Sequence, residues 1–197
     1  MNKAFSQVFR MGQLTTSLGP DVLALMRFEG VERLNDLFDW QVECLAANDD
    51  IDFDALIGTH ATVTLHDRQV ERHFDGIVTE ARWMGAGENG HRYRLRLQPW
   101  FKLASLRRNQ RIFHNLSVIE ILTELLSAYG DAGALVVATS AEYPELEYTV
   151  QFRESDMEFA TRLMERHGIS YYFRHEAGAH SMVLTDCVDV HDSIGRR

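Results

Sequence analysis

The spacing of apolar residues changes near residue 100, and this change constrains the fold more than any other feature of the sequence. Before that point apolar residues recur at every second position, as in Val22, Ala24, Met26 and Phe28, which is the spacing of a half-buried β-strand. Similar β-branched and aromatic stretches follow between turn-prone clusters: LFDWQVECLA, ATVTLHD, RHFDGIVTEARWM and HRYRLRLQPW. The first hundred residues are therefore predicted to form five or six strands of a small antiparallel barrel or sandwich.

The second half of the chain shows a mixed pattern. Two segments, Ser117–Glu120 and Ser155–Glu158, match the capping box, in which a Ser hydroxyl and a Glu carboxylate satisfy free N–H groups at a helix start. Apolar residues at three- and four-residue spacing follow each box, and Gly130 and Gly168 are predicted to end the two helices in a left-handed conformation. The segments EYTVQF, ISYYFRHE and HSMVLTD favour strands.

The expected fold class is therefore mixed and mainly β (α+β). An antiparallel β-barrel-like domain is predicted over residues 1–100, followed by an α+β domain with two capped helices over residues 101–197. No strand or helix pattern closes the second domain after the last predicted hairpin, so we expect it to be incomplete at its C-terminus.

Charge is distributed unevenly along the chain. The net charge is −9, yet residues 89–119 contain seven basic residues and no acidic one. The overall negative charge opposes general binding to phosphate backbones, so no nucleic-acid partner is expected. The basic residues are predicted instead to face acidic groups of the same assembly. The candidate residues of such a domain or subunit interface are Arg92, Arg94, Arg96, Arg107, Arg108 and Arg111.

Motifs for cofactors and calcium are incomplete. The glycines of residues 85–90 match G-x-G-x-x-G, but a strand pattern rather than a helix follows them, which predicts a hairpin loop and no dinucleotide cofactor. Asp50, Asp52 and Asp54 resemble the start of an EF-hand loop that lacks the Gly at its sixth position and the Glu at its twelfth. They are interpreted as a solvated acidic connector.

Histidines and acids gather near the C-terminus without the HxxxH spacing of a zinc protease. They are interpreted as scattered surface residues: His167, His175, His180, Asp186, Asp189 and His191. No G-x-S-x-G nucleophile motif occurs, and Cys44 lies in an apolar strand, where a thiol serves as a small buried hydrophobe. With 29 acidic residues a catalytic pair of carboxylates remains an open alternative, but no sequence pattern indicates a particular pair. No catalytic, cofactor-binding or metal-binding residue is assigned, and the protein is predicted not to be an enzyme.

The sequence also indicates a compartment. Cys44 and Cys187 are the only cysteines, so neither a disulfide framework nor a CxxC metal site is available, and a reducing compartment is expected. The first residues, MNKAFSQVFRMGQ, lack the apolar core of a signal peptide, and the chain contains no run of about 18 apolar residues. Synthesis and first folding in the cytoplasm, without a membrane span, are predicted.

Taken in order, these segments resemble the N-terminal hub region of the VgrG spike proteins of type VI secretion, and more distantly the baseplate hubs of contractile-tailed phages. The resemblance extends from about residue 12 to residue 187 and rests on four segments: LGPDVLALMRFEGVERLNDLFDWQVECLA, RHFDGIVTEARWMG, YRLRLQPWFKLASLRRNQRIFHNLSVIEILTELL and YTVQFRESDMEFATRLMERHGISYYFRHEAGAHSMVLTD. It implies a β-barrel-like hub domain and a structural role without catalysis.

In that family three hubs assemble around an axis, and their barrels form a ring that stacks on the hexameric Hcp tube. The resemblance therefore implies two partners. One is the Hcp tube protein, and the other is further copies of the chain, which form a homotrimer in the full-length protein. Secreted effectors or adaptors would bind through C-terminal regions that this chain lacks. The implied location is cytoplasmic during assembly, followed by secretion into target cells or the medium. A phage or prophage tail hub is the alternative, and an enzymatic effector module is disfavoured.

Overall fold

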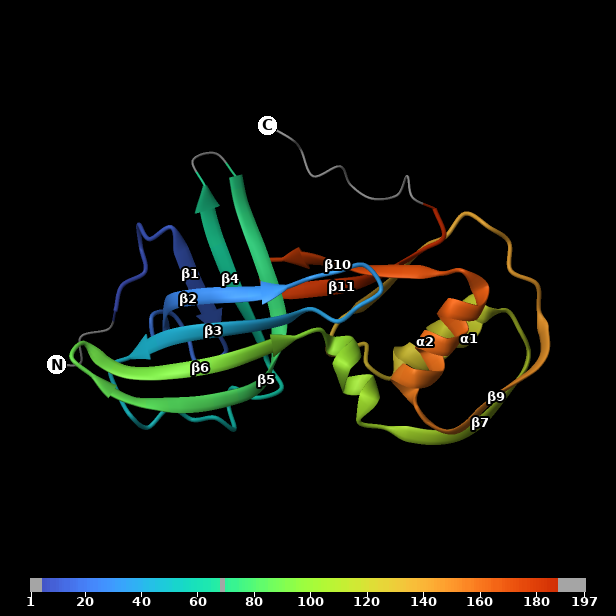
Figure 1. Ribbon diagram of the computed structural model, residues 1–197, viewed down its shortest axis with the longest axis horizontal. Helices are drawn as coiled ribbons and strands as arrows, with labels where there is room; N and C mark the ends of the chain where they lie inside the picture. The colour runs from blue at the N-terminus through green and yellow to red at the C-terminus, as the bar shows by residue number, and fades with distance from the viewer. Residues whose placement is uncertain (1–4, 68–69, 188–197) are drawn as a thin grey trace. The chain divides into compact units, whose positions relative to one another are not determined.

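The fold is mainly β with few helices, as the sequence predicts (Figure 1). The structure, a computed structural model, describes residues 5–67 and 70–187. The described chain forms two compact units. Unit 1 contains the residues up to Arg33, Leu37–Trp100 and His175–His180, and unit 2 contains Leu34–Asp36, Phe101–Arg174 and the residues from Ser181 onward. The domain limits predicted from the sequence, 1–100 and 101–197, stay a prediction.

Unit 1 is built on a curled antiparallel sheet of six strands, in the order β1-β4-β5-β6-β3-β2 (Figure 1). The strands are β1 (Gly12–Thr16), β2 (Ala24–Val31), β3 (Asp39–Ala46), β4 (His60–Asp67), β5 (Val70–Gly87) and β6 (Gly90–Gln98). The predicted number of strands is confirmed. The glycine-rich segment is the tight β5–β6 hairpin, in which Gly87 pairs with Gly90, as predicted.

The two central strands show why this sequence forms a half-buried sheet. Alternate residues of β3, among them Val42 and Cys44, are fully buried, and Tyr93 and Leu95 of β6 are buried on the same face. Burial of apolar surface stabilises the folded state by about 25 cal/mol for each Å² removed from water. Burial, together with the nearby Glu43 carboxylate, raises the pKa of Cys44 to about 12. This thiol is therefore a buried hydrophobe, as predicted.

The alternation predicted over residues 22–28 is wrong at one position. A β-bulge shifts the register between Leu25 and Arg27, where β2 pairs with β3. A bulge inserts one extra residue and so moves the following side chains to the other face of the sheet. Met26 is consequently 51% exposed rather than buried beside Ala24.

The two edge strands of the sheet are joined by a buried side chain. Gln7 is 5% exposed, and its Oε1 accepts hydrogen bonds from the N–H groups of Leu14 in β1 (2.8 Å) and Leu25 in β2 (2.9 Å). Its Nε2 donates to the Leu14 carbonyl at 3.0 Å. Gln7 therefore satisfies backbone groups of both edge strands and bridges β1 to β2.

Unit 2 combines two helices with short β-structure. Its elements are η1 (Trp100–Ser105, beginning with the last residue of unit 1), β7 (Arg108–Leu116), α1 (Val118–Ser127), β8 (Ala134–Ala138), β9 (Leu146–Ser155), α2 (Asp156–His167), β10 (Ser170–Glu176) and β11 (Ala179–Thr185). Strands β7 and β9 form an antiparallel pair, which we call the ribbon, and β8 pairs in parallel with β11 of the β10–β11 hairpin. The tip of this hairpin belongs to unit 1.

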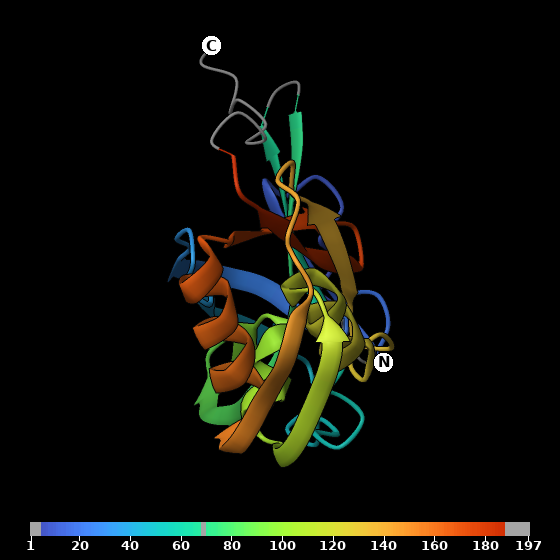
Figure 2. The same cartoon turned by 90° about the vertical axis from the view of Figure 1, so that its right-hand side faces the viewer.

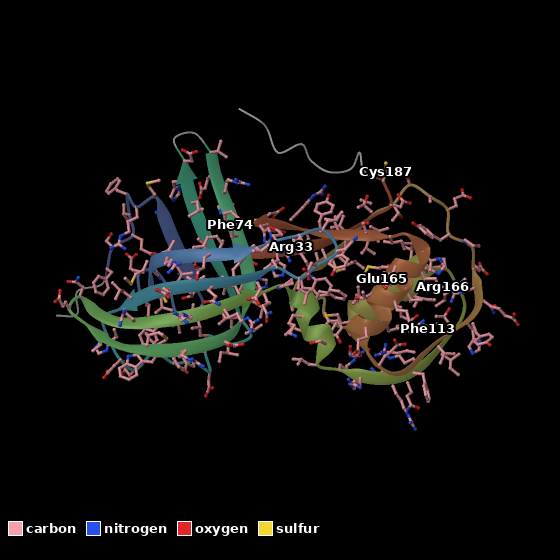
Figure 3. The ribbon with its side chains drawn as sticks, viewed as in Figure 1. Arg33, Phe74, Phe113, Glu165, Arg166 and Cys187 are labelled. Carbon is pink, nitrogen blue, oxygen red and sulfur yellow. The ribbon has the colours of Figure 1, made fainter. Side chains whose placement is uncertain are left out.

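The helices lie side by side against one face of the ribbon (Figure 2). Figure 3 shows Phe113 directed from β7 toward the helices, where its ring stacks on Phe159 of α2 with centroids 5.7 Å apart. Val118, Ile121, Leu122 and other apolar residues of α1 are buried in the same core. The amphipathic pattern of the sequence thus places the inner face of the ribbon in the core of unit 2. Within the described residues, no helix is both long and apolar enough to cross a membrane.

Both capping boxes form as predicted, but only one of the two predicted helix ends is right. Ser117 and Ser155 each accept a hydrogen bond from the N–H three residues later, and the Glu side chain returns the bond. Gly168 ends α2 in the left-handed conformation (φ 69°). Gly130 does not end α1, which stops at the right-handed Ala128. The chain continues there in i→i+3 turns, so no left-handed residue is needed.

Candidate functional site

Three of the six candidate arginines lie on the outward face of β6: Arg92, Arg94 and Arg96. Arg96 Nε lies 2.8 Å from Asp39 Oδ1 on β3, and its NH1 lies 2.7 Å from Glu80 Oε1 on β5. Arg94 NH2 lies 2.8 Å from Glu43 Oε1. The hydrogen bonds from Arg96 to Asp39 and Glu80 raise its pKa further above the ordinary arginine value. Acidic groups of neighbouring strands therefore compensate two of these three arginines.

Beside them lies a positive charge for which the described part of the chain supplies no ion pair. Arg82 of β5 lies directly opposite Arg94 of β6 in the strand register and is exposed. The two arginines line a groove of about 270 Å³ together with Gln41, Leu95, Arg96 and Glu80, and the Glu80 carboxylate is paired with Arg96. Like charges at directly opposed positions weaken a sheet, so a carboxylate placed in this groove would relieve the repulsion. The groove is the part of unit 1 best suited to an acidic group from another molecule.

The arginines that follow η1 surround a buried carboxylate in unit 2. Asp156, the first residue of α2, is fully buried, and Arg107 Nε lies 2.8 Å from its Oδ2 while Arg111 NH2 lies 3.9 Å away. The Tyr129 hydroxyl donates to Oδ2 and the Gln151 amide to Oδ1, both at 2.8 Å. Burial, with the bond to Asp156, raises the pKa of Tyr129 to about 12. Arg107 and Arg111 thus hold together the interior of unit 2, and their role at an interface stays a prediction.

The ribbon carries apolar residues on both faces. Opposite the helix-covered face, Ile112 (61% exposed) pairs in register with Val150 (37%), and Tyr148 (63%) and Phe152 (62%) extend the same surface. A two-stranded sheet with one covered face normally presents polar residues on the other. The sequence pattern missed this surface because β7, whose alternation is interrupted by polar residues, was not predicted as a strand.

A buried polar cluster in unit 1 joins residues far apart in the sequence. Asp75 Oδ1 accepts hydrogen bonds from His60 Nδ1 (2.7 Å) and His180 Nδ1 (2.8 Å), and its Oδ2 accepts one from the Thr62 hydroxyl (2.7 Å). The Trp100 N–H donates to His180 Nε2 at 2.9 Å. His180 is therefore the neutral tautomer with its proton on Nδ1.

This cluster corrects the interpretation of the C-terminal histidines as surface residues. The side chain of His180 is fully buried and that of His175 is 9% exposed. Asp189 and His191 lie outside the described residues. Asp186, in unit 2, accepts hydrogen bonds from the N–H groups of Ser140 and Ala141, which lower its pKa to about 2. These contacts hold the loop that follows β8 in place.

His60, Asp75 and His180 are also the residue types that bind zinc, and their ligand atoms lie within 4.8 Å of one another. Around a tetrahedral zinc with bonds of about 2.0 Å, neighbouring ligand atoms are about 3.3 Å apart. The 2.7 and 2.8 Å contacts to Asp75 are shorter, and the Trp100 N–H occupies His180 Nε2. The geometry fits a hydrogen-bonded network better than a metal site.

Burial and hydrogen bonding act in opposite directions on these groups. Burial alone would raise the pKa of Asp75, but hydrogen bonds from His180, His60 and Thr62 outweigh it and lower the pKa. Burial lowers the pKa of His180 despite its bond to Asp75. The cluster is therefore an ionised carboxylate that holds a neutral His180, and it joins the tip of the β10–β11 hairpin to the sheet of unit 1.

Proteins of one class share this fold. The Escherichia coli c3393 protein, described as a component of the type VI secretion system with structural similarity to the T4 tail proteins gp27 and gp5, superimposes with a TM-score of 0.76 at 22% identity, covering 86% of this chain and 48% of that one. A tail protein from Neisseria meningitidis gives a TM-score of 0.55 at 12% identity, covering 79% of this chain and 45% of that one. The fold is that of a class of proteins found in phage-like tails and in type VI secretion systems.

The chain belongs to the phage tail baseplate hub (GPD) family, whose model matches residues 31–196. It is 38% identical over 194 residues to the type VI secretion system spike protein VgrG1b of Pseudomonas aeruginosa, and 38% identical over 191 residues to VgrG1c of the same organism. Each alignment covers 96% of this chain but 26% of the relative. The chain thus spans about a quarter of the length of these curated relatives.

Proposed function

We propose that the chain is the hub module of a type VI secretion spike, which stacks on an Hcp tube and takes part in puncturing and effector delivery. The observation that supports this most is the 38% identity to a named spike protein over 96% of the chain. In this proposal copies of the chain associate as hubs, and effectors or adaptors bind through regions found in the longer relatives. The module is cytoplasmic during assembly and is then secreted with the spike.

The physical character of the module agrees with an assembly role. The outward face of β6 is covered by ion pairs between strands, and exposed pairs of this kind typically contribute less than about 1 kcal/mol each to stability. Charges arranged in this way favour recognition of another charged surface over stability of the fold. The groove beside Arg82 and the outer face of the ribbon are the two surfaces that this proposal leaves for partners.

Stacking can be tested with purified proteins. The chain is mixed with the hexameric tube protein encoded in the same genome, and sedimentation velocity and cryo-electron microscopy then show whether it caps the tube. A hub bound at tube ends is the expected result. Free chain and uncapped tubes at concentrations of about 100 μM would contradict the proposal, because a contact with a dissociation constant of about 10 μM or below would be mostly occupied at that concentration.

A phage or prophage tail hub is the second candidate, because the family model that matches this chain describes a phage tail baseplate hub. The two functions differ in the tube that is capped. The same binding experiment with the major tail-tube protein of a resident prophage separates them: capping of that tube, and not of the secretion tube, would favour the phage function.

We propose that the chain has no catalytic activity of its own. A relative from Vibrio cholerae is named actin cross-linking toxin VgrG1, and it is 31% identical over 185 residues that span 87% of this chain but 16% of the toxin. Because this chain aligns with only 16% of the toxin, we assign the cross-linking activity to the remainder of the toxin. Incubation of the chain with actin and ATP should give no cross-linked product, with the toxin as the positive control.

A further inference from the structure

The outer face of the ribbon has the composition of a contact surface. Four large side chains, Ile112, Tyr148, Val150 and Phe152, lie exposed on one face of β7 and β9. Contiguous apolar surface of this kind on a water-soluble unit marks an interaction site. The opposite face is already buried against the helices, so this face is available to another molecule.

One end of this surface is held in an unusual conformation. Arg153 has a left-handed backbone (φ 56°), which is rare for a residue other than Gly, Asn or Asp, and it is the extra, unpaired residue of a bulge in β9, between Phe152, which pairs with Gln110, and Glu154, which pairs with Asn109. The Arg153 guanidinium lies over the Phe152 ring at 5.1 Å, and Arg108 NH1 donates to the Arg153 carbonyl at 3.4 Å. The exposed ring of Phe152 thus lies against one exposed arginine, and a second exposed arginine contacts the neighbouring backbone. Arg108 also acts by its charge on Glu158 of α2, whose pKa is lowered by hydrogen bonds from Ser155 and further by Arg108.

Unit 1 carries a surface with complementary chemistry. A pocket of about 180 Å³ is lined largely by apolar side chains, among them Pro20, Val22 and Ile51. The exposed Asp49 and Asp50 belong to the loop that forms its edge. A cavity of about 150 Å³ holds one benzene molecule, so this pocket has room for a phenyl ring. The segment that the sequence suggested as an acidic connector therefore borders an apolar pocket.

The charges decide how two copies of the chain would meet. Contact of ribbon against ribbon would bring arginines together and cost binding energy, since like charges across an interface repel. Contact of the ribbon with the acidic edge of the pocket pairs opposite charges. Such a contact uses two different surfaces, so it is a head-to-tail contact that either closes into a ring or continues as a filament.

We propose that copies of this chain associate head to tail, with Phe152 of one copy inserted into the apolar pocket of the next and Arg153 and Arg108 facing Asp49 and Asp50 of that next copy. The inference rests on the self-association in the proposed function and is independent of tube stacking. It names the surface and the kind of partner: a second copy of this chain.

The first test removes the anchor. Phe152→Ser leaves the buried face of the ribbon unchanged, so circular dichroism should show an intact fold. Loss of an aromatic anchor from the centre of a contact typically raises the dissociation constant by about thirtyfold or more. Sedimentation velocity over a concentration series measures this constant. Trp83→Ser removes another exposed aromatic side chain, 51% exposed on β5, and should leave association unchanged.

The second test exchanges the charges. Arg153→Asp keeps a residue type that tolerates the left-handed backbone, and Asp50→Lys reverses the opposite side. Each single change should weaken association about tenfold or more. The double variant carries both changes in every copy and should recover most of the loss, because each contact again pairs opposite charges. Arg72→Asp is the matched control, since it reverses an exposed arginine of β5 that lies outside the contact and outside the groove beside Arg82.

The outcomes separate this inference from the broader proposal. The named contact would be overturned if Phe152→Ser still formed oligomers, or if the double charge variant associated no more tightly than the single variants. Self-association itself would remain in either case. A wild-type chain that is monomeric at about 100 μM would overturn the inference as a whole. Tube capping by such a monomer would still support the hub function.

Discussion

At the scale of single residues, the second capping box offers a direct test of local stability. Ser155 is 3% exposed and accepts a hydrogen bond from the Glu158 N–H at 3.1 Å. Ser155→Ala leaves this donor without its partner, and we expect a loss of about 1 kcal/mol in the free energy of unfolding. Urea denaturation measures the change. Ser127→Ala, an exposed serine at the end of α1, is the control, and equal midpoints for both variants would refute the capping role.

The buried histidine of unit 1 makes stability depend on pH. The pKa of His180 is lowered in the folded state, so the unfolded chain binds the proton at a higher pH. Its contribution to stability is therefore fully present above the unfolded value of about 6.5 and is lost as the pH falls through the folded pKa. The pKa of Asp75 is also lowered, and its contribution is lost at still lower pH, below about 3.9. Neighbouring His60 and His175 lower the pKa of His180 further by charge repulsion.

Denaturation of the wild type at a series of pH values from 7 to 5 should show falling stability, and His180→Gln should lose stability at pH 7 but show a flatter dependence. Protonation of His180 would also place a proton on Nε2, where the Trp100 N–H now donates, so the two donors would oppose one another. His114→Gln, at an exposed position on β7, is the control. Parallel pH profiles for wild type and His180→Gln would contradict this account.

At the scale of elements, local patterns predicted what local forces decide. Alternating apolar residues predicted β3 and β6, and the Ser–Glu pairs predicted both helix starts. The patterns failed where pairing with a distant strand decides the outcome. Met26 is exposed because β2 bulges where it pairs with β3, and β7 forms because β9, some forty residues later, pairs with it.

The candidate site shows the same limit. An acid-free segment drew attention to the arginines, but their partners Asp39 and Glu80 come from other strands. The Asp75–His180 bond joins residues 105 positions apart. No spacing rule within a single sequence links such residues, because folding of the sheet and not their sequence distance brings them together.

One buried amide, that of Gln7, bridges the two edge strands of the six-stranded sheet. Gln7→Ala would leave the N–H groups of Leu14 and Leu25 without their acceptor, and an unsatisfied buried donor costs about 1–3 kcal/mol. We expect a loss of about 2–4 kcal/mol in the free energy of unfolding. Hydrogen exchange at these two amides should accelerate more than exchange at buried amides of β6. Gln110→Ala, an exposed glutamine on β7, is the control. Unchanged exchange at Leu14 and Leu25 would show that Gln7 does not join the edge strands.

At the scale of the whole molecule, the uneven charge of the chain gains a physical role. Two copies with a net charge of −9 repel each other at long range, while the proposed contact pairs arginines with aspartates locally. These two effects act over different distances. The Debye length is about 10 Å at 0.1 M salt and about 3 Å at 1 M, so the long-range repulsion is already largely screened at the lower concentration. A further rise in salt therefore acts mainly on the local pairs.

Association should consequently weaken as NaCl rises from 0.1 to 1 M, and the dissociation constant of the wild type should increase severalfold. Phe152→Ser removes apolar contact and no charge, so it should bind more weakly at every salt concentration with the same slope. Arg153→Ser removes one charge of the contact and should flatten the slope. Sedimentation velocity of the three proteins at four salt concentrations measures these slopes. A salt-independent wild type, or equal slopes for wild type and Arg153→Ser, would show that the arginines of the ribbon do not pair with an acidic surface.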